Sequence, residues 1–159
     1  MLKYLILSLF ISFSLISVAQ NFYLGIPYDK VVMNDCDIVI MPQLSWDFNR
    51  TFSQAGLRQI DDIVDFISNY PDFDFEIILF GDKNRLNDYE EKLLEKKALL
   101  AKKLIISHKS YDPKLNISVI HCLESKFKYC KFTSKENKKL YKNFSEALSN
   151  RVEIRFKSK

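Results

Sequence analysis

The sequence has few of the residues from which most catalytic and metal sites are built. It contains three glycines, two histidines and three cysteines among 159 residues. It has no Gly-x-Ser-x-Gly nucleophile motif, no phosphate-binding loop and no Cys/His group with metal-ligand spacing. We therefore expect a protein that is not an enzyme and that uses no metal and no cofactor.

Long apolar runs are also scarce, and the only one lies at the N-terminus. Tyr4–Ile16 is almost continuously apolar, Lys3 precedes it, and Ser17–Ala19 supplies small residues just before Gln20. This is the pattern of a secretory signal peptide over residues 1–19. A membrane anchor is the alternative, but the run is shorter than the roughly 20 residues that a spanning helix needs. We expect a mature exported chain that begins at Gln20 and has no transmembrane segment.

The three cysteines leave two interpretations open. Export permits disulfides. Cys122 and Cys130 are eight residues apart, a spacing that closes a short loop, and this pairing would leave Cys36 over. Three unpaired cysteines are the alternative.

Acidic residues are scarce in the second half of the mature chain, and basic residues are scarce in the first. Residues 20–91 carry 5 basic and 14 acidic side chains, whereas residues 92–159 carry 18 basic and 6 acidic ones. One interpretation is a solvated basic helix face and a basic loop. The other is a basic surface that faces an anionic polymer, such as cell-wall glycan-peptide or lipid headgroups. No nucleic-acid-binding motif is present, and we expect no nucleic-acid partner.

Apolar residues at spacings of three and four predict two long helices. The first is expected over Thr51–Tyr70 and ends at Pro71, because the residue before a proline disfavours the helical region. The second is expected over Asp88–Ser107. A capping box at Thr133–Glu136 predicts a third helix. The buried stripes are expected to be Leu57, Ile60, Val64 and Ile67 in the first helix, Leu94, Ala98, Ala101 and Ile105 in the second, and Leu140, Phe144, Ala147 and Leu148 in the third.

Four strands are predicted around these helices. Asp37–Leu44 should lie at an edge or end near Pro42, which cannot donate a ladder hydrogen bond. Phe73–Phe80 ends apolar on both faces, as expected for a strand buried between two layers. Leu115–Cys122 is the third strand. Arg151–Phe156 alternates between polar and apolar residues and is predicted to be half-buried.

The order β-α-β-α-β-(α)-β predicts one α/β domain over residues 37–159. Two main helices cannot cover both faces of a four-stranded sheet. We therefore expect a two-layer sandwich with both helices packed on one face of a mixed four-stranded sheet. Residues 20–36 are predicted to be an N-terminal linker or to add a small strand near Val31–Met33.

Three chemically distinctive positions share this layout. Within Phe75–Ala98, Asp82 follows an apolar strand, and Lys97 lies fifteen residues later on the second helix. Asn150–Val152 then opens the last strand. In this arrangement the chain resembles a divergent member of the outer-membrane protein A (OmpA-like) family, in its C-terminal, peptidoglycan-binding domain. The resemblance covers about Asp37–Phe156.

The resemblance implies a ligand and the residues that bind it. In the family, an aspartate and an arginine hold the diaminopimelate residue of the peptidoglycan stem peptide. Those positions fall on Asp82 and Lys97 here, and the family's final motif falls on Asn150 and Arg151. We therefore expect Asp82, Lys97, Arg151 and Asn150 to form a peptidoglycan-binding site.

Several positions depart from the family pattern. Leu79 and Gly81 replace a loop glycine and threonine, Glu90 and Leu94 replace an asparagine and a serine, and Lys97 replaces the arginine. Lysine keeps the positive charge but lacks the planar fork that binds a carboxylate through two parallel hydrogen bonds. The expected binding is therefore weaker and less oriented.

Three of the site residues also have a purely structural interpretation. Asp82 fits a turn or helix-capping residue. Lys97 fits a solvated lysine on a lysine-rich helix, and Arg151 fits an ion-pair partner of Glu90 or Glu95. These alternatives stay open at this point.

Two functions are consistent with these patterns. The first is an exported, non-catalytic cell-envelope protein that binds peptidoglycan in the periplasm, with association to the outer membrane. The second is a degenerate OmpA-like domain that no longer binds the wall and serves as an envelope scaffold or protein-interaction module. A small exported enzyme is a third and weaker interpretation.

Overall fold

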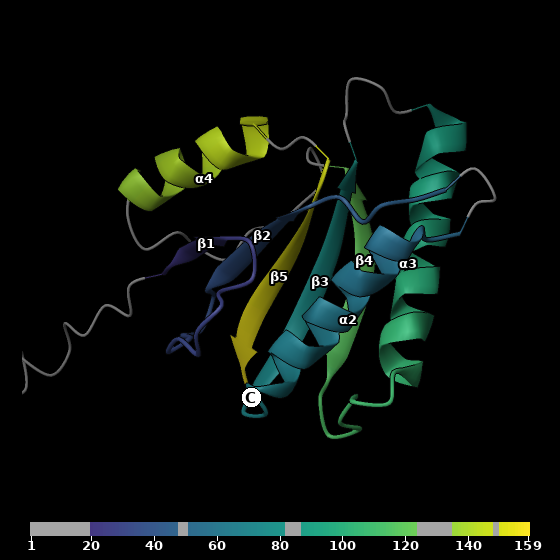
Figure 1. The fold of residues 1–159 in the computed structure, drawn as a ribbon. Helices are drawn as coiled ribbons and strands as arrows, with labels where there is room; N and C mark the ends of the chain where they lie inside the picture. Colours follow the sequence, from purple (N-terminus) through teal and green to yellow (C-terminus); the bar gives the residue numbers. More distant parts are fainter. Residues whose placement is uncertain (1–19, 48–50, 82–86, 124–134, 148–149) are drawn as a thin grey trace, which may run out of the picture.

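The computed structural model describes residues 20–47, 51–81, 87–123, 135–147 and 150–159. The described residues form a five-stranded sheet with helices on both of its faces (Figure 1). The elements in chain order are β1 (Phe22–Leu24), β2 (Ile38–Pro42), α2 (Gln54–Ser68), β3 (Phe73–Gly81), α3 (Asp88–Ser107), β4 (Ile117–Leu123), α4 (Lys135–Ala147) and β5 (Arg151–Ser158).

The sheet is mixed, and its last strand in the sequence lies at its centre. The strand order is β1-β2-β5-β3-β4. β5 runs antiparallel to both β2 and β3, whereas β1 pairs with β2, and β3 with β4, in parallel. The predicted α/β fold with a mixed sheet is confirmed, with one strand more than the four expected.

The additional strand is β1, at the edge of the sheet. The prediction of an extra strand near Val31–Met33 is therefore wrong in position. Asp37, just before β2, accepts the backbone N–H of Asn21 at 2.7 Å and that of Asn34 at 2.8 Å. These bonds hold Asn21 beside the start of β2. Val31 instead donates its N–H to the hydroxyl of Tyr70, and its carbonyl accepts from the same hydroxyl.

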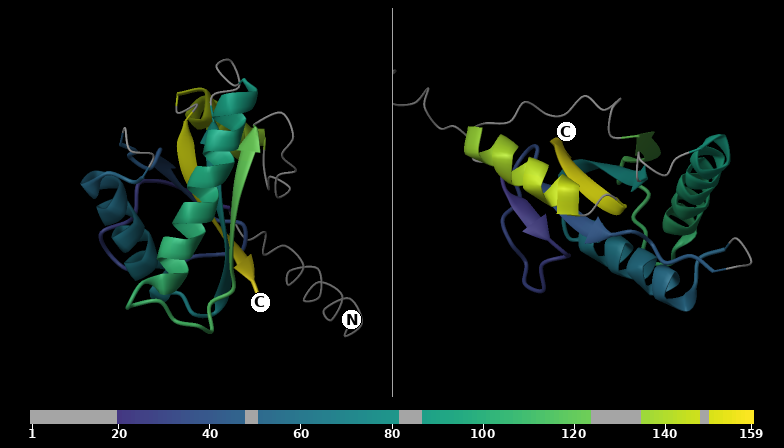
Figure 2. Two further views of the ribbon diagram at one scale, coloured as in Figure 1. Left: turned by 90° about the vertical axis from the view of Figure 1, so that its right-hand side faces the viewer. Right: turned by 90° about the horizontal axis from the view of Figure 1, so that it is seen from above.

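The main core lies between the sheet and α2 and α3, which cover one face, whereas α4 lies over the other (Figures 1 and 2). Val152, Ile154 and Phe156 of β5 are fully buried in this core. The Phe156 ring meets that of Phe66 on α2 at a centroid distance of 5.8 Å. The predicted packing of two main helices on one face is confirmed, and α4 adds a partial third layer.

The buried face of α2 differs from the prediction in its first turn. Ile60 and Val64 are buried as expected, but Leu57 is 40% exposed, and Gly56 is the buried residue there. A Cβ at Gly56 would overlap the backbone carbonyl oxygen of Ser45. The connection between β2 and α2 therefore lies directly against the helix, and only glycine leaves room for it.

The buried face of α4 also differs from the prediction. Leu140 is 43% exposed, and Tyr141 is the buried side chain in its place. The predictions for Phe144, Ala147 and Leu148 concern side chains outside the described part of the chain. An aromatic side chain with a hydroxyl, rather than an aliphatic one, thus faces the sheet at this point of α4.

Two further predictions involve residues outside the described ranges. These are the signal peptide, residues 1–19, and the pairing of Cys122 with Cys130. Both stay predictions. Within the described residues, none of the helices has the length and the apolar character required to cross a bilayer.

Candidate functional site

The last residues of β3 and the first residues of β5 lie side by side at one end of the sheet. Phe80 pairs with Arg151, so that Asn150 comes opposite Gly81, the last residue of β3. Asn150 is exposed there. Asp82, the predicted anionic ligand, follows Gly81 in the sequence and lies outside the described residues. Among the described residues, Asn150 and Arg151 are therefore the predicted site residues at this end of the sheet.

Lys97 lies on α3 at the border of its buried face, between the buried residues Leu94 and Ala98. Its side chain is half-buried, and burial lowers the pKa of its ammonium below the ordinary lysine value. Its Nζ lies 5.2 Å from the centroid of the Trp46 ring. No carboxylate of the described residues forms an ion pair with it. A half-buried ammonium that forms no ion pair with the described residues can bind a carboxylate of a ligand.

Trp46 lies in the connection between β2 and α2, and sequence reasoning missed it. It is the single tryptophan of the chain, and this scarcity is the only signal that could have singled it out. Its ring meets Phe52 edge-on at a centroid distance of 4.9 Å, and the two residues form an antiparallel bridge. Tertiary packing thus brings an aromatic side chain from a distant part of the sequence against Lys97.

Arg151 lies on the face of the sheet opposite the main core, and its side chain is fully buried. Its Nε donates to Oε1 of Glu153 at 2.7 Å, and its Nη2 donates to the hydroxyl of Tyr141 at 3.0 Å. The guanidinium carbon lies 4.0 Å from the centroid of the Phe80 ring. Burial by itself disfavours the charge, but Glu153 and Tyr141 outweigh it and raise the pKa of Arg151 above its ordinary value.

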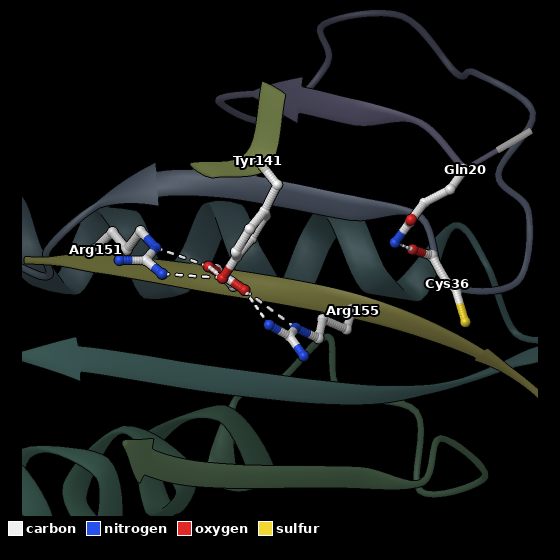
Figure 3. Close-up of polar contacts among 6 residues, drawn as sticks. Gln20, Cys36, Tyr141, Arg151 and Arg155 are labelled. Atoms are coloured by element: carbon white, nitrogen blue, oxygen red, sulfur yellow. Dashed lines mark hydrogen bonds and ion pairs between the residues drawn. The ribbon is translucent and has the colours of Figure 1, made fainter. Parts of the chain in front are cut away.

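Glu153 joins two arginines on this buried face (Figure 3). Its Oε2 accepts from Nη2 of Arg155 at 2.6 Å and from Nε at 3.1 Å. Its Oε1 also accepts from the hydroxyl of Tyr141 at 2.7 Å. The prediction that β5 is half-buried is wrong, because its polar face is buried as well and meets Tyr141 of α4.

Arg151 does not join Lys97 in the structure. Successive side chains of a strand point to opposite faces, and the neighbouring β5 residues that face α2 and α3 are the apolar ones. Among the described residues, the ion pair of Arg151 is with Glu153 and not with Glu90 or Glu95 of α3. The alternative pairing with these two acids is therefore wrong, and Arg151 has a structural place beneath α4.

Other parts of the described structure offer no competing metal site. An open cavity of about 540 Å³ lies between the turn after β1 and α2, with Asp62 and Asp65 in its lining. Of the predicted site residues that the structure describes, Lys97, Asn150 and Arg151, none lines it. Within the described ranges, no group of three or more His, Cys, Asp or Glu side chains could hold a metal ion.

The arrangement of helices and strands has counterparts among solved structures. The crystal structure of the periplasmic domain of Helicobacter pylori MotB, residues 97–256, aligns with 80% of this chain and 86% of its own length, at 20% identity and a TM-score of 0.50. The chain shares the fold of this periplasmic domain. A longer fragment of the same protein, residues 78–256, gives 18% identity and a TM-score of 0.49 over 80% of this chain and 79% of that fragment.

A third comparison is more distant. The OmpA-like domain of FopA1 from Francisella tularensis subsp. tularensis SCHU S4 aligns with 90% of this chain and 94% of its own length, at 14% identity. Its TM-score of 0.39 is too low to establish a shared fold. The sequence matches no protein-family model and no curated protein. The likeness to known structures therefore concerns the fold, and a ligand has to be argued from the residues.

Proposed function

We propose that this chain is an exported, non-catalytic domain of the cell envelope that binds the diaminopimelate stem peptide of peptidoglycan in the periplasm. The observation that carries the proposal is the state of Lys97. Its half-buried ammonium borders the core, and no acidic partner is found for it among the described residues. The fold shared with a periplasmic domain supports a place in the envelope.

Diaminopimelate ends in an ammonium and a carboxylate on one carbon, so its site needs an anion and a cation held apart. In this proposal Asp82 binds the ammonium and Lys97 binds the carboxylate. Asn150 is exposed directly before β5. Its side-chain amide can donate hydrogen bonds to the stem peptide and accept them from it. Arg151 does not touch the ligand. It fixes the first residue of β5 by stacking on Phe80.

The test is a pull-down of the purified mature chain, residues 20–159, with insoluble peptidoglycan that contains diaminopimelate. Asp82→Ala should abolish retention, and Lys97→Ala should weaken it. Lys97→Arg should strengthen retention, because a guanidinium binds a carboxylate through two hydrogen bonds. A charge-assisted bond of this kind is worth about 1.5–3 kcal/mol, which corresponds to roughly tenfold or more in affinity.

Matched controls separate a site from a diffuse charge effect. Lys96 is exposed on the same helix, so Lys96→Ala makes the same charge change outside the site. Asp72 is exposed before the other end of β3, so Asp72→Ala is the control for Asp82→Ala. Insoluble peptidoglycan should retain both control variants as well as it retains the unchanged chain. Equal losses from Lys96→Ala and Lys97→Ala would contradict the site.

The second candidate function is an envelope scaffold or protein-interaction module that has lost wall binding. The lysine at position 97 and the altered residues Leu79 and Gly81 favour it. It would be supported if the unchanged chain failed to bind and Lys97→Arg gained nothing. Retention that survives Asp82→Ala but is released by salt would instead indicate the basic surface alone.

A further inference from the structure

We propose that Trp46 is a positioning residue for the Lys97 ammonium, which it holds in one place by a cation–π contact. The ligand of this ammonium rests on the proposed function, but the contact itself does not. Lysine has a limitation as a ligand for a carboxylate. Its ammonium is a point charge on a flexible four-carbon stem, so a lone lysine does not fix the direction from which a carboxylate is bound.

Hydrogen bonds hold the residues on either side of Trp46. The N–H of Ser53 donates to the carbonyl of Ser45 at 3.1 Å, and the N–H of Asp47 donates to the carbonyl of Thr51 at 3.0 Å. The carboxylate of Asp47 also accepts from the Thr51 hydroxyl at 3.1 Å. These bonds flank Trp46 on both sides. Its backbone therefore has little freedom to move away from α3.

The ends of this connection are tied to α2. Oε1 of Gln59 accepts the N–H of Ser45 at 3.0 Å. Gly56 lies against the carbonyl of Ser45, where a larger side chain would not fit. The Trp46 ring is further fixed edge-on against Phe52. The backbone next to Trp46 and the Trp46 ring are thus both fixed by contacts. We call this ring, packed on Phe52, the Trp46 platform, against which another side chain can pack.

Lys97 meets this platform from α3. The distance of 5.2 Å from Nζ to the ring centroid is within the range of cation–π contacts, in which tryptophan is the strongest aromatic partner. Both side chains are only partly buried, so the site remains open to a ligand from solvent. An aromatic face neutralises no charge. The lysine is therefore oriented without losing the positive charge that a carboxylate needs.

The first test needs no ligand. The ring current of Trp46 should shift the ε-methylene protons of Lys97 upfield relative to those of Lys96 in a ¹H–¹³C spectrum. Trp46→Leu should abolish this shift, and Trp46→Phe should keep part of it. An unshifted Lys97 signal in the unchanged, folded chain would overturn the proposal, whatever the chain binds.

Fluorescence gives a second ligand-free measurement, because the chain has one tryptophan. Lys97→Ala should change the emission of Trp46, whereas the matched variant Lys96→Ala should leave it unchanged. Thermal unfolding of each variant checks that the fold is kept. Equal emission in all three proteins would contradict a Trp46–Lys97 contact in solution.

A double-mutant cycle then tests the role in binding. With a soluble stem peptide that ends in diaminopimelate as the probe, Trp46→Leu should lower the affinity about fivefold, the effect of a modest cation–π contact. The same change made in the Lys97→Ala background should have no effect, since there is no ammonium left to position. An equal loss in both backgrounds would overturn the positioning role. Failure of the unchanged chain to bind the probe would count against the proposed function, while the ligand-free measurements would still decide the contact.

Discussion

Glu153 is the residue on which the second face of the sheet depends. It is fully buried and is the acidic partner of both Arg151 and Arg155. Burying a carboxylate costs desolvation free energy, which its hydrogen bonds and ion pairs offset. Removing one partner of such a buried pair is therefore strongly destabilising, even where the pair adds little net stability. The hydroxyl of Tyr141 donates to the same carboxylate and connects it to α4.

The first prediction is that Glu153→Gln lowers the free energy of unfolding by about 3–5 kcal/mol, because it removes the charge of a buried carboxylate to which both Arg151 and Arg155 donate. Urea unfolding of the purified domain measures it. Glu76→Gln is the matched control, since it removes a partly exposed ion pair with Lys157 and should cost less than about 1 kcal/mol. Equal effects of the two changes would contradict the account of the buried network.

The second prediction concerns the pH dependence of binding at Lys97. Burial lowers the pKa of its ammonium from the ordinary value of 10.5, so Lys97 loses its charge at a lower pH than an exposed lysine does. Binding of a carboxylate should therefore decline as the pH rises through this lowered pKa. Lys97→Arg should lose less binding over the same range, because arginine stays protonated and only the ammonium of the ligand then titrates. Identical pH profiles for the two proteins would argue against Lys97 as the cation.

The same shift has a consequence for stability with the opposite sign. The unfolded chain, with its higher lysine pKa, binds more protons than the folded chain in the alkaline range. Charged Lys97 therefore opposes folding below its lowered pKa, and this opposition is relieved as the pH rises toward 10.5. Binding and stability should thus respond to alkaline pH in opposite directions at this residue.

At the scale of elements, the approach of the β2–α2 connection to α2 is decisive for the site. The third prediction is that Gly56→Ala destabilises the domain by about 1–3 kcal/mol, because its Cβ would overlap the Ser45 carbonyl. It should also weaken the ring-current shift at Lys97, since the Trp46 platform would move. If helix propensity were the only effect, Gly56→Ala would raise the free energy of unfolding by about 1 kcal/mol. A measured gain would therefore contradict the close approach.

β5 is the element on which the main core converges. Phe156 contacts the rings of Phe66, Tyr70, Phe73 and Phe75 at centroid distances of 5.8, 5.4, 5.3 and 5.1 Å. The fourth prediction is that Phe156→Ala costs about 3–5 kcal/mol in chemical unfolding. Val32→Ala is the control, because the Val32 side chain is 84% exposed. It should lower the free energy of unfolding by less than about 0.5 kcal/mol.

At the scale of the whole molecule, Lys97 and the buried polar network lie on opposite sides of the sheet (Figure 1). Lys97 of α3 and Trp46, its proposed positioning residue, are in contact on the side of α2 and α3. The buried polar network lies on the other side, where Tyr141 of α4 meets β5 (Figure 3). Substitutions in the network should change stability without altering the chemistry of the ligand residues.

The fifth prediction is that the mature protein begins at or near Gln20. Lys3, the apolar run Tyr4–Ile16 and the small residues Ser17–Ala19 motivate it. N-terminal sequencing of the protein recovered from the periplasmic fraction measures it. Recovery of the chain in the cytosolic fraction with Met1 still present would contradict it.

Sequence periodicity by itself determined most elements of this protein. The stripes of α2 and α3, and the apolar strands β3 and β5, follow from side-chain spacing, because one face of each must be buried. The mixed α/β sheet followed from their order. The resemblance to the OmpA-like family singled out Lys97, and in the structure this residue is half-buried against the Trp46 ring.

Only the tertiary structure decided which residues surround Lys97 and what Arg151 does. Periodicity reports which face of an element is apolar, but not which distant segment comes to lie against it. Trp46 reaches Lys97 because Gly56 lets a connection pass close to α2. Arg151 is buried because α4 returns over the opposite face of the sheet, where a polar strand face would otherwise meet water.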